Sequence, residues 1–68
     1  MSLFIRKYCD LIQELDNGME LWCCKHSDTY WVVAGRYRAE IAGIDMHGDA
    51  WAVPKAVARI HDKINGVR

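Results

Sequence analysis

Strand-forming residues dominate the middle of this chain, between residues 19 and 41, and they constrain its fold more than any other feature. Polar and apolar residues alternate strictly along 36–41, which is the pattern of a strand with one face buried and one face in water. Residues 29–33 are Thr, Tyr, Trp, Val and Val, the β-branched and aromatic types that pack well on a pleated surface. The middle of the chain is therefore predicted to be β-sheet.

Two short turn signals divide this region into three strands. Residues 19–26 form the first strand, and Ser27 and Asp28 lead by a tight turn into the second. The pair Ala34 and Gly35 allows a further reversal into the third strand. Strands joined by short turns pair in antiparallel hairpins, so we expect a three-stranded antiparallel sheet.

The first part of the chain has the spacing of an amphipathic helix. Between Ser2 and Asp16, apolar and charged side chains fall on opposite sides of a helix with about 3.6 residues per turn. Ser2 is a suitable N-cap, and Gly18 can adopt the left-handed conformation that ends a helix. The apolar positions are Phe4, Tyr8, Leu11, Ile12 and Leu15. We predict a helix over residues 2–16.

A second amphipathic helix is predicted near the other end of the sequence, over residues 53–64. Pro54 fits its first turn, where a missing backbone N–H costs nothing, and Gly66 can end it. The apolar positions are Val53, Val57, Ile60 and Ile64, with His61 beside them. Between the sheet and this helix, residues 43–49 are expected to form a loop or the turn of a further short hairpin that reaches Trp51.

These elements together predict the fold class. The 68 residues are enough for a single domain, 1–68. Each amphipathic helix needs an apolar surface to cover, and the simplest arrangement places both helices on one face of the sheet. We therefore predict a two-layer α+β sandwich of order α-β-β-β-α. Its antiparallel sheet has three strands, or four if the further hairpin forms, and its other face is open.

The charges and the cysteines limit the class of protein. Nine Lys and Arg residues balance nine Asp and Glu residues, which removes the overall basic field that draws proteins to nucleic acids and membrane surfaces. The three cysteines are an odd number, and the adjacent pair Cys23 and Cys24 cannot bridge to itself without severe distortion. The sequence has neither a signal-peptide pattern at its start nor an apolar run of roughly 18 residues. We expect a reduced, soluble, cytoplasmic protein.

Cysteine and histidine, the usual zinc ligands, gather at Cys23, Cys24 and His26, and His47 and His61 are available to complete a set. The spacing weighs against such a site. Cys23 and Cys24 point to opposite faces if they lie in a strand, and the sequence lacks the C-x-x-C loop of structural zinc sites. We expect one core thiol, one surface thiol and no metal.

Two other motifs are weighed against simpler interpretations. Residues 45–49 begin like a calcium loop, but alanine stands where that pattern needs its glycine and its glutamate. Cys24, His26 and Asp28 supply the residue types of a nucleophile, a base and an orienting carboxylate, but no glycine-rich turn or helix start adjoins them to stabilise an oxyanion. The sequence therefore predicts a protein without catalytic residues or cofactor.

The open face of the predicted sheet is the favoured binding surface. The large apolar side chains of the strands, Trp22 and Trp31 among them, cannot all lie beneath the helices, and an aromatic patch with a charged rim is typical of a protein interface. Lys55, Arg59 and Lys63 recur every four residues and form a basic stripe along the second helix. The residues predicted to bind a partner are Trp22, Trp31, Arg36, Arg38 and Glu40 on the sheet and Lys55, Arg59 and Lys63 on the helix.

Two variants of this hypothesis remain open. Arginines beside aromatic rings also hold phosphates and stack bases, so a nucleic-acid-binding regulator is the alternative function, although the balanced charge favours a protein partner. Association of two copies through the open face would bury more surface than a chain of this size buries alone. A homodimer is therefore a natural variant.

In size, in its lack of a catalytic constellation and in its compact helix-and-sheet make-up, the chain resembles the small inhibitors and regulators encoded by phages and other mobile elements, anti-CRISPR proteins among them. This resemblance implies a non-enzymatic viral protein that acts in the cytoplasm of the host cell. It also implies steric inhibition, in which the protein covers a surface of a larger protein or nucleoprotein complex.

Overall fold

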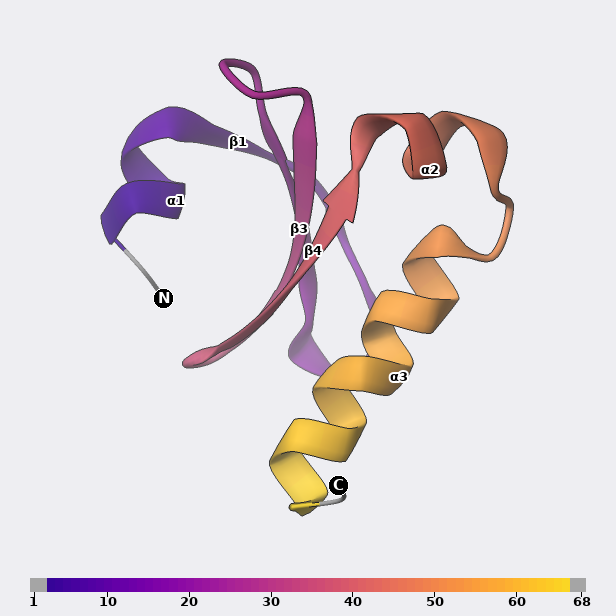
Figure 1. Ribbon diagram of the computed structural model, residues 1–68. Helices are drawn as coiled ribbons and strands as arrows, with labels where there is room; N and C mark the ends of the chain where they lie inside the picture. Colours follow the sequence, from indigo (N-terminus) through magenta and orange to yellow (C-terminus); the bar gives the residue numbers. More distant parts are fainter. Residues whose placement is uncertain (1–2, 67–68) are drawn as a thin grey trace.

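The computed structural model in Figure 1 describes residues 3–66, with all of their side chains except those at positions 3, 4, 6 and 17. The elements are α1 (Leu3–Tyr8), β1 (Cys9–Glu14), the 3-10 turn η1 (Asp16–Gly18), β2 (Glu20–Cys24), β3 (Thr29–Ala34), β4 (Tyr37–Ala42), α2 (Gly43–Gly48) and α3 (Ala52–Asn65). None of the helices in this part of the chain is long and apolar enough to cross a bilayer.

The strands pair with their neighbours in sequence, in the order β1-β2-β3-β4, and every pair is antiparallel. The predicted antiparallel α+β class is thus confirmed, with four strands. In β4, Ala39 and Ile41 are buried while Arg38 and Glu40 are exposed, which confirms the predicted alternation along this strand. The four-residue turn between β2 and β3 ends at Asp28, which has a positive φ of 47°.

One face of the sheet packs against α3. Leu21, Val32 and Ala39 form one row across β2, β3 and β4, and they share a hydrophobic cluster with Ala56 and Ile60 of α3. All five side chains are at most 4% exposed. The helix therefore buries a continuous apolar stripe on a continuous apolar surface, which is the main source of stability in a domain of this size.

The helix predicted over residues 53–64 is confirmed as α3. Gly66 ends it in the left-handed conformation, with a φ of 71°, as its missing Cβ allows. The loop or hairpin predicted over 43–49 is wrong, because Gly43–Gly48 forms α2. At the start of α2 the backbone N–H of Gly43 donates a hydrogen bond of 2.8 Å to the carbonyl of Asp28, and a Cβ at Gly43 would collide with Asp28. Only glycine permits this close approach.

The opposite face of the sheet is partly covered by α1. Ile5 of α1 is fully buried in a second cluster with Cys9, Cys24 and Val33. Figure 1 shows α1 and α3 on opposite sides of the sheet. The prediction that both terminal helices cover one face is therefore wrong, and so is the predicted order α-β-β-β-α, because two helices follow four strands. Since α3, together with α2, covers one face, the short α1 makes its apolar contact on the other.

The predicted N-terminal helix is wrong beyond Tyr8, where the chain passes into β1 (Cys9–Glu14). Its helical spacing places Leu11 and Ile12 in the core, yet they are 44% and 51% exposed. The extended backbone instead pairs with β2, and a β-bulge leaves Ile12 without an opposite residue. Residues 15–19 join β1 directly to β2, but the apolar spacing of residues 4–15 is that of a helix, so the periodicity does not reveal this pairing. The predicted N-cap, Ser2, lies outside the described residues.

Candidate functional site

The register of the sheet aligns two tryptophans in one row. Trp22 of β2 lies directly opposite Trp31 of β3, whose other neighbour is Glu40 of β4. Leu11 of β1 lies opposite Trp22, so the row crosses all four strands. Residues opposite each other in antiparallel strands share a face of the sheet. We name this site the tryptophan face and define it by Leu11, Glu20, Trp22, Trp31, Arg38 and Glu40.

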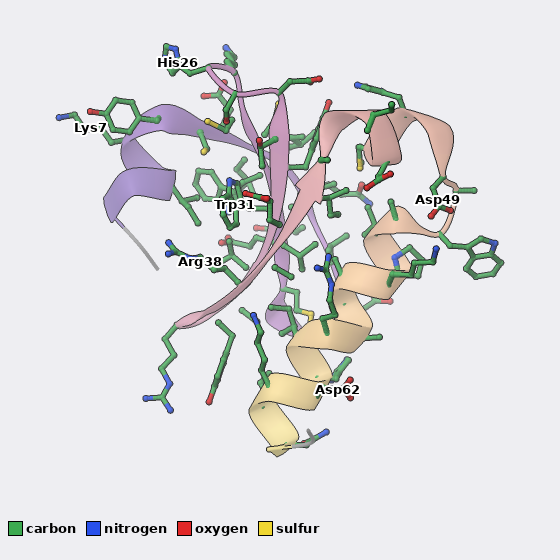
Figure 2. The ribbon with its side chains drawn as sticks, in the orientation of Figure 1. Lys7, His26, Trp31, Arg38, Asp49 and Asp62 are labelled. Carbon is green, nitrogen blue, oxygen red and sulfur yellow. The ribbon has the colours of Figure 1, made fainter. Side chains whose placement is uncertain are left out.

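Charged side chains contact both indole rings of the tryptophan face. Glu20 Oε1 accepts a hydrogen bond of 3.3 Å from Nε1 of Trp22. The guanidinium of Arg38 lies over the Trp31 ring, 5.4 Å from its centroid, in a cation–π contact. Figure 2 shows Trp31 and Arg38 on the side of the sheet that faces α1. These contacts restrict the orientations of the two rings, and a side chain that is already ordered loses less entropy in an interface.

The helix α1 covers only part of the tryptophan face. Trp22 and Trp31 are half-buried and pack against the cluster around Ile5, whereas Leu11 and Arg38 are exposed. Nε1 of Trp31 is buried and has no hydrogen-bond acceptor among the described residues. The accessible part of the tryptophan face therefore includes Leu11, Arg38 and the exposed portions of the two rings.

Carboxylates outnumber cations among the strand side chains that the register places on and next to the tryptophan face. Glu20 and Glu40 belong to it, and Glu14 at the end of β1 lies directly opposite Glu20. Arg38 is the cation that the register places among them, and its guanidinium is engaged with an indole ring. A phosphate backbone meets more repulsion than attraction on such a surface. The local charge therefore favours a basic partner.

Arg36, a predicted binding residue, does not share the face of Arg38. It lies in the turn between β3 and β4, because β4 begins only at Tyr37. There its guanidinium stacks over the Tyr37 ring at 5.2 Å and donates a hydrogen bond of 3.2 Å to the hydroxyl oxygen of Tyr37. This phenol pairing raises the pKa of Arg36. The positive charge of Arg36 therefore lies at the tip of the hairpin formed by β3 and β4.

Lys55, also predicted to bind a partner, is paired with Asp49 just before α3. Their charged atoms are 2.8 Å apart, and the other carboxylate oxygen of Asp49 accepts a hydrogen bond of 2.9 Å from the backbone N–H of Trp51. The ammonium group first, and this N–H second, hold the pKa of Asp49 below its usual range. Figure 2 shows Asp49 on the α3 side of the molecule, away from Trp31. Lys55 thus helps to fix the start of a helix.

The other two predicted cations of α3 contact the edge of the sheet. Arg59 donates a hydrogen bond of 2.8 Å to the backbone carbonyl of Glu40, and Lys63 donates one of 2.9 Å to that of Arg38. These carbonyls point outward from the edge strand β4. Occupying them protects the edge from pairing with another chain. The predicted basic stripe therefore lies along the β4 edge and does not extend the tryptophan face.

Two members of the tryptophan face are absent from the predicted set. Leu11 is missed because its segment has helical spacing, and nothing local reveals its strand partner. Glu20 is two positions before Trp22, so both share a face of any strand that contains them. That signal is present in the sequence. The turn at residues 25–28 also fixes the pairing of Trp22 with Trp31, because a hairpin turn sets the register of its strands.

The cysteine and histidine residues are distributed over both faces of the sheet. Cys23 lies opposite Tyr30, on the side of α3, whereas Cys24 is buried in the cluster beneath α1. His47 of α2 meets the Tyr30 ring edge to face at 5.9 Å. Among the side chains that the structure describes, no three His, Cys, Asp or Glu residues gather closely enough to hold a metal ion.

Comparison with models of protein families, with curated proteins and with solved structures finds no match to this chain. Its function is therefore inferred from the shape and charge of its own surface.

Proposed function

We propose that this chain is a small, non-enzymatic binding protein that recognises another protein through its tryptophan face. The observation that supports the proposal is the row of Leu11, Trp22, Trp31 and Glu40 on the side of the sheet that α3 does not cover. Tryptophan and arginine contribute most to protein interfaces, because they bury large areas while retaining a polar group. Two half-buried indoles, one under a guanidinium, have this composition.

The proposed mode of action is steric: the chain covers a surface that a larger complex needs for its own substrate. An interface of standard size takes about 800 Å² from each partner, against 4824 Å² for the whole surface of this chain. When an interface of that size forms on the tryptophan face, the bulk of the molecule, 31 × 28 × 20 Å, stands in front of the covered site. We propose an inhibitor or regulator in the cytoplasm of a host cell, as the resemblance to small phage inhibitors implies.

The charge of the site favours a partner segment that carries Arg or Lys beside an apolar group. Glu20 and Glu40 are placed to receive such cations around the indole rings. A nucleic acid would bring phosphates to the same carboxylates, so the alternative of a nucleic-acid-binding regulator has weaker support. Electrostatic complementarity of this kind mainly raises the association rate and makes binding sensitive to charge reversal.

A pair of matched charge-reversal variants tests the proposal. Glu40→Lys reverses a carboxylate on the tryptophan face, and Asp62→Lys reverses one on α3, away from that face (Figure 2). Both side chains are exposed, so both variants are expected to fold. The wild-type chain captures partners from extracts of its natural host, and affinities for the purified partner are then measured by calorimetry. We expect Glu40→Lys to weaken binding of a basic partner about tenfold or more and Asp62→Lys to change it by less than about twofold.

A second matched pair removes an indole ring. Trp31→Ala truncates the tryptophan face, while Trp51→Ala removes a ring that is 68% exposed outside it. Circular dichroism shows whether each variant folds. Equal losses of affinity in Glu40→Lys and Asp62→Lys, or in the two tryptophan variants, contradict the proposed site. Binding to short DNA or RNA that weakens steeply with salt contradicts a protein partner. Sedimentation that shows a dimer, lost in Glu40→Lys, identifies a second copy as the partner.

A further inference from the structure

Cys9 and Cys24 face each other across the first two strands. Cys9 begins β1, Cys24 ends β2, and the antiparallel register places them directly opposite each other. Both are buried in the cluster beneath α1, at 5% and 2% exposure, and their sulfur atoms share a hydrogen bond. Opposite residues in antiparallel strands have Cα atoms about 4.5–5.5 Å apart, which is within the range that a disulfide spans. The backbone is therefore already arranged for a bridge.

The surroundings of the two sulfur atoms differ. The turn after β2 brings the hydroxyl of Ser27 and the backbone N–H groups of His26 and Ser27 to the sulfur of Cys24. These hydrogen bonds, that of the Ser27 hydroxyl first, lower the pKa of Cys24 although the side chain is buried. Burial raises the pKa of Cys9 to about 11, and its bond to Cys24 adds to this shift. Cys24 is therefore the cysteine of the pair that more readily forms the nucleophilic thiolate, while Cys9 keeps its proton.

A pocket of about 290 Å³ gives access to Cys24. Its other walls are Tyr8 at the end of α1 and the turn residues His26 and Ser27, all of which are exposed to solvent. The rings of Tyr8 and His26 meet edge to face, with their centroids 6.1 Å apart. One water molecule occupies about 30 Å³ in the liquid. The pocket is thus large enough to admit a small hydroperoxide.

We propose that Cys24 and Cys9 form a redox-active dithiol that a small hydroperoxide converts into an intrachain disulfide between β1 and β2. In the first step the Cys24 thiolate attacks the peroxide, so that an S–O bond forms, the O–O bond breaks, and the departing oxygen takes up a proton. In the second step the Cys9 sulfur attacks the resulting sulfenic acid. The S–S bond forms, the S–O bond breaks, and water leaves with the proton of Cys9. The dithiol gives two electrons and the peroxide accepts them.

Cys23 provides an internal reference for this chemistry. It lies on the other face of the sheet, opposite Asp10 of β1 and Tyr30 of β3. A bridge from Cys23 to Cys9 requires a strand to turn over, because adjacent residues of a strand point to opposite faces. Its thiol should therefore survive the reaction. This inference does not depend on the proposed binding function, since it involves a different end of the sheet face.

Hydrogen peroxide is the probe for the decisive experiment on the wild-type chain. The reduced protein is treated with peroxide, the remaining thiols are blocked with iodoacetamide, and the intact mass is measured. We expect two of the three thiols to be lost, with a decrease of two hydrogen masses before blocking, and dithiothreitol to restore all three. If all three thiols survive a treatment that oxidises free cysteine completely, the dithiol proposal is overturned.

Serine variants identify the bridge. Cys23→Ser keeps both sulfur atoms of the pair, so it should still lose two thiols and yield one cross-linked peptide pair that contains Cys9 and Cys24. Cys9→Ser removes the resolving thiol, so dimedone should label the sulfenic acid on Cys24. A bridge that involves Cys23, a bridge between two chains, or an unlabelled Cys24 contradicts the assignment. If a variant fails to fold, tandem mass spectrometry of the oxidised wild-type chain locates the bridge instead.

Discussion

Two isoleucines of α3, one turn apart, are expected to respond very differently to truncation. Ile60 is fully buried against the sheet, whereas Ile64 is 49% exposed, although both belong to the same apolar stripe in the sequence. We compare Ile60→Ala with Ile64→Ala, which remove the same three carbon atoms from the same helix. Alanine is the best helix former, so neither change weakens α3 through its backbone preference.

The expected cost follows from burial. Three methyl or methylene groups at about 0.8 kcal/mol each give roughly 2.5 kcal/mol for Ile60, and the cavity left behind raises this to about 3–4 kcal/mol. The Ile64 side chain is only about half buried, so its truncation loses about half of the burial energy and leaves no cavity. We therefore expect Ile64→Ala to lower the free energy of unfolding by about 1 kcal/mol. A domain of this size has a total stability of about 3–10 kcal/mol. Ile60→Ala therefore removes a large fraction of it.

Urea unfolding, followed by far-ultraviolet circular dichroism, measures both variants. With an m value of about 1 kcal/mol/M, the midpoint should fall by about 3 M for Ile60→Ala and by about 1 M or less for Ile64→Ala. If the wild-type midpoint is lower than the shift expected for Ile60→Ala, this variant should be unfolded even without urea, while Ile64→Ala should remain folded. Equal midpoints for the two variants would refute the packing of α3 through Ile60 and the energy derived from it.

Three further outcomes are expected. Asp49→Asn should lower stability at neutral pH. The pKa of Asp49 is depressed in the folded state, so its contribution is present above the ordinary value of 3.8 and is lost as pH falls through the folded value. Thermal unfolding curves of wild type and variant should therefore differ at neutral pH and converge in acid, below the folded value. The proposed disulfide between Cys9 and Cys24 closes a loop of about fifteen residues, which stabilises the folded state by about 3 kcal/mol. Peroxide treatment should therefore raise the Tm by roughly 10–20 °C in calorimetry. An unchanged Tm would argue against a native bridge. The double variant Arg59→Ala and Lys63→Ala frees two backbone carbonyls of the β4 edge. Light scattering should therefore detect faster self-association than in the wild type. A variant as monodisperse as the wild type would contradict the proposed edge protection.

The candidate site is predictable where local patterns fix the register. A strand has a period of two and a short turn fixes which residues lie opposite each other, so Trp31, Arg38 and Glu40 emerge from the sequence as neighbours on one face. The sequence also predicts Arg36 on that face, but β4 begins one residue later than predicted, at Tyr37, so Arg36 lies in the turn instead of the strand. The use of Lys63 at the strand edge depends on where α3 crosses β4, which no local pattern encodes.

The sequence by itself determined the elements whose signals are local. The alternation along β4, the turn after β2 and the stripe of α3 with Gly66 at its end are all consequences of backbone geometry within a few residues. The tertiary structure alone decided that residues 9–14 extend into β1, because only pairing with β2 outweighs their helical spacing. It also decided that α1 and α3 take opposite faces and that Cys9 meets Cys24. Contacts between distant residues depend on how whole surfaces pack, and local periodicity carries no information about that choice.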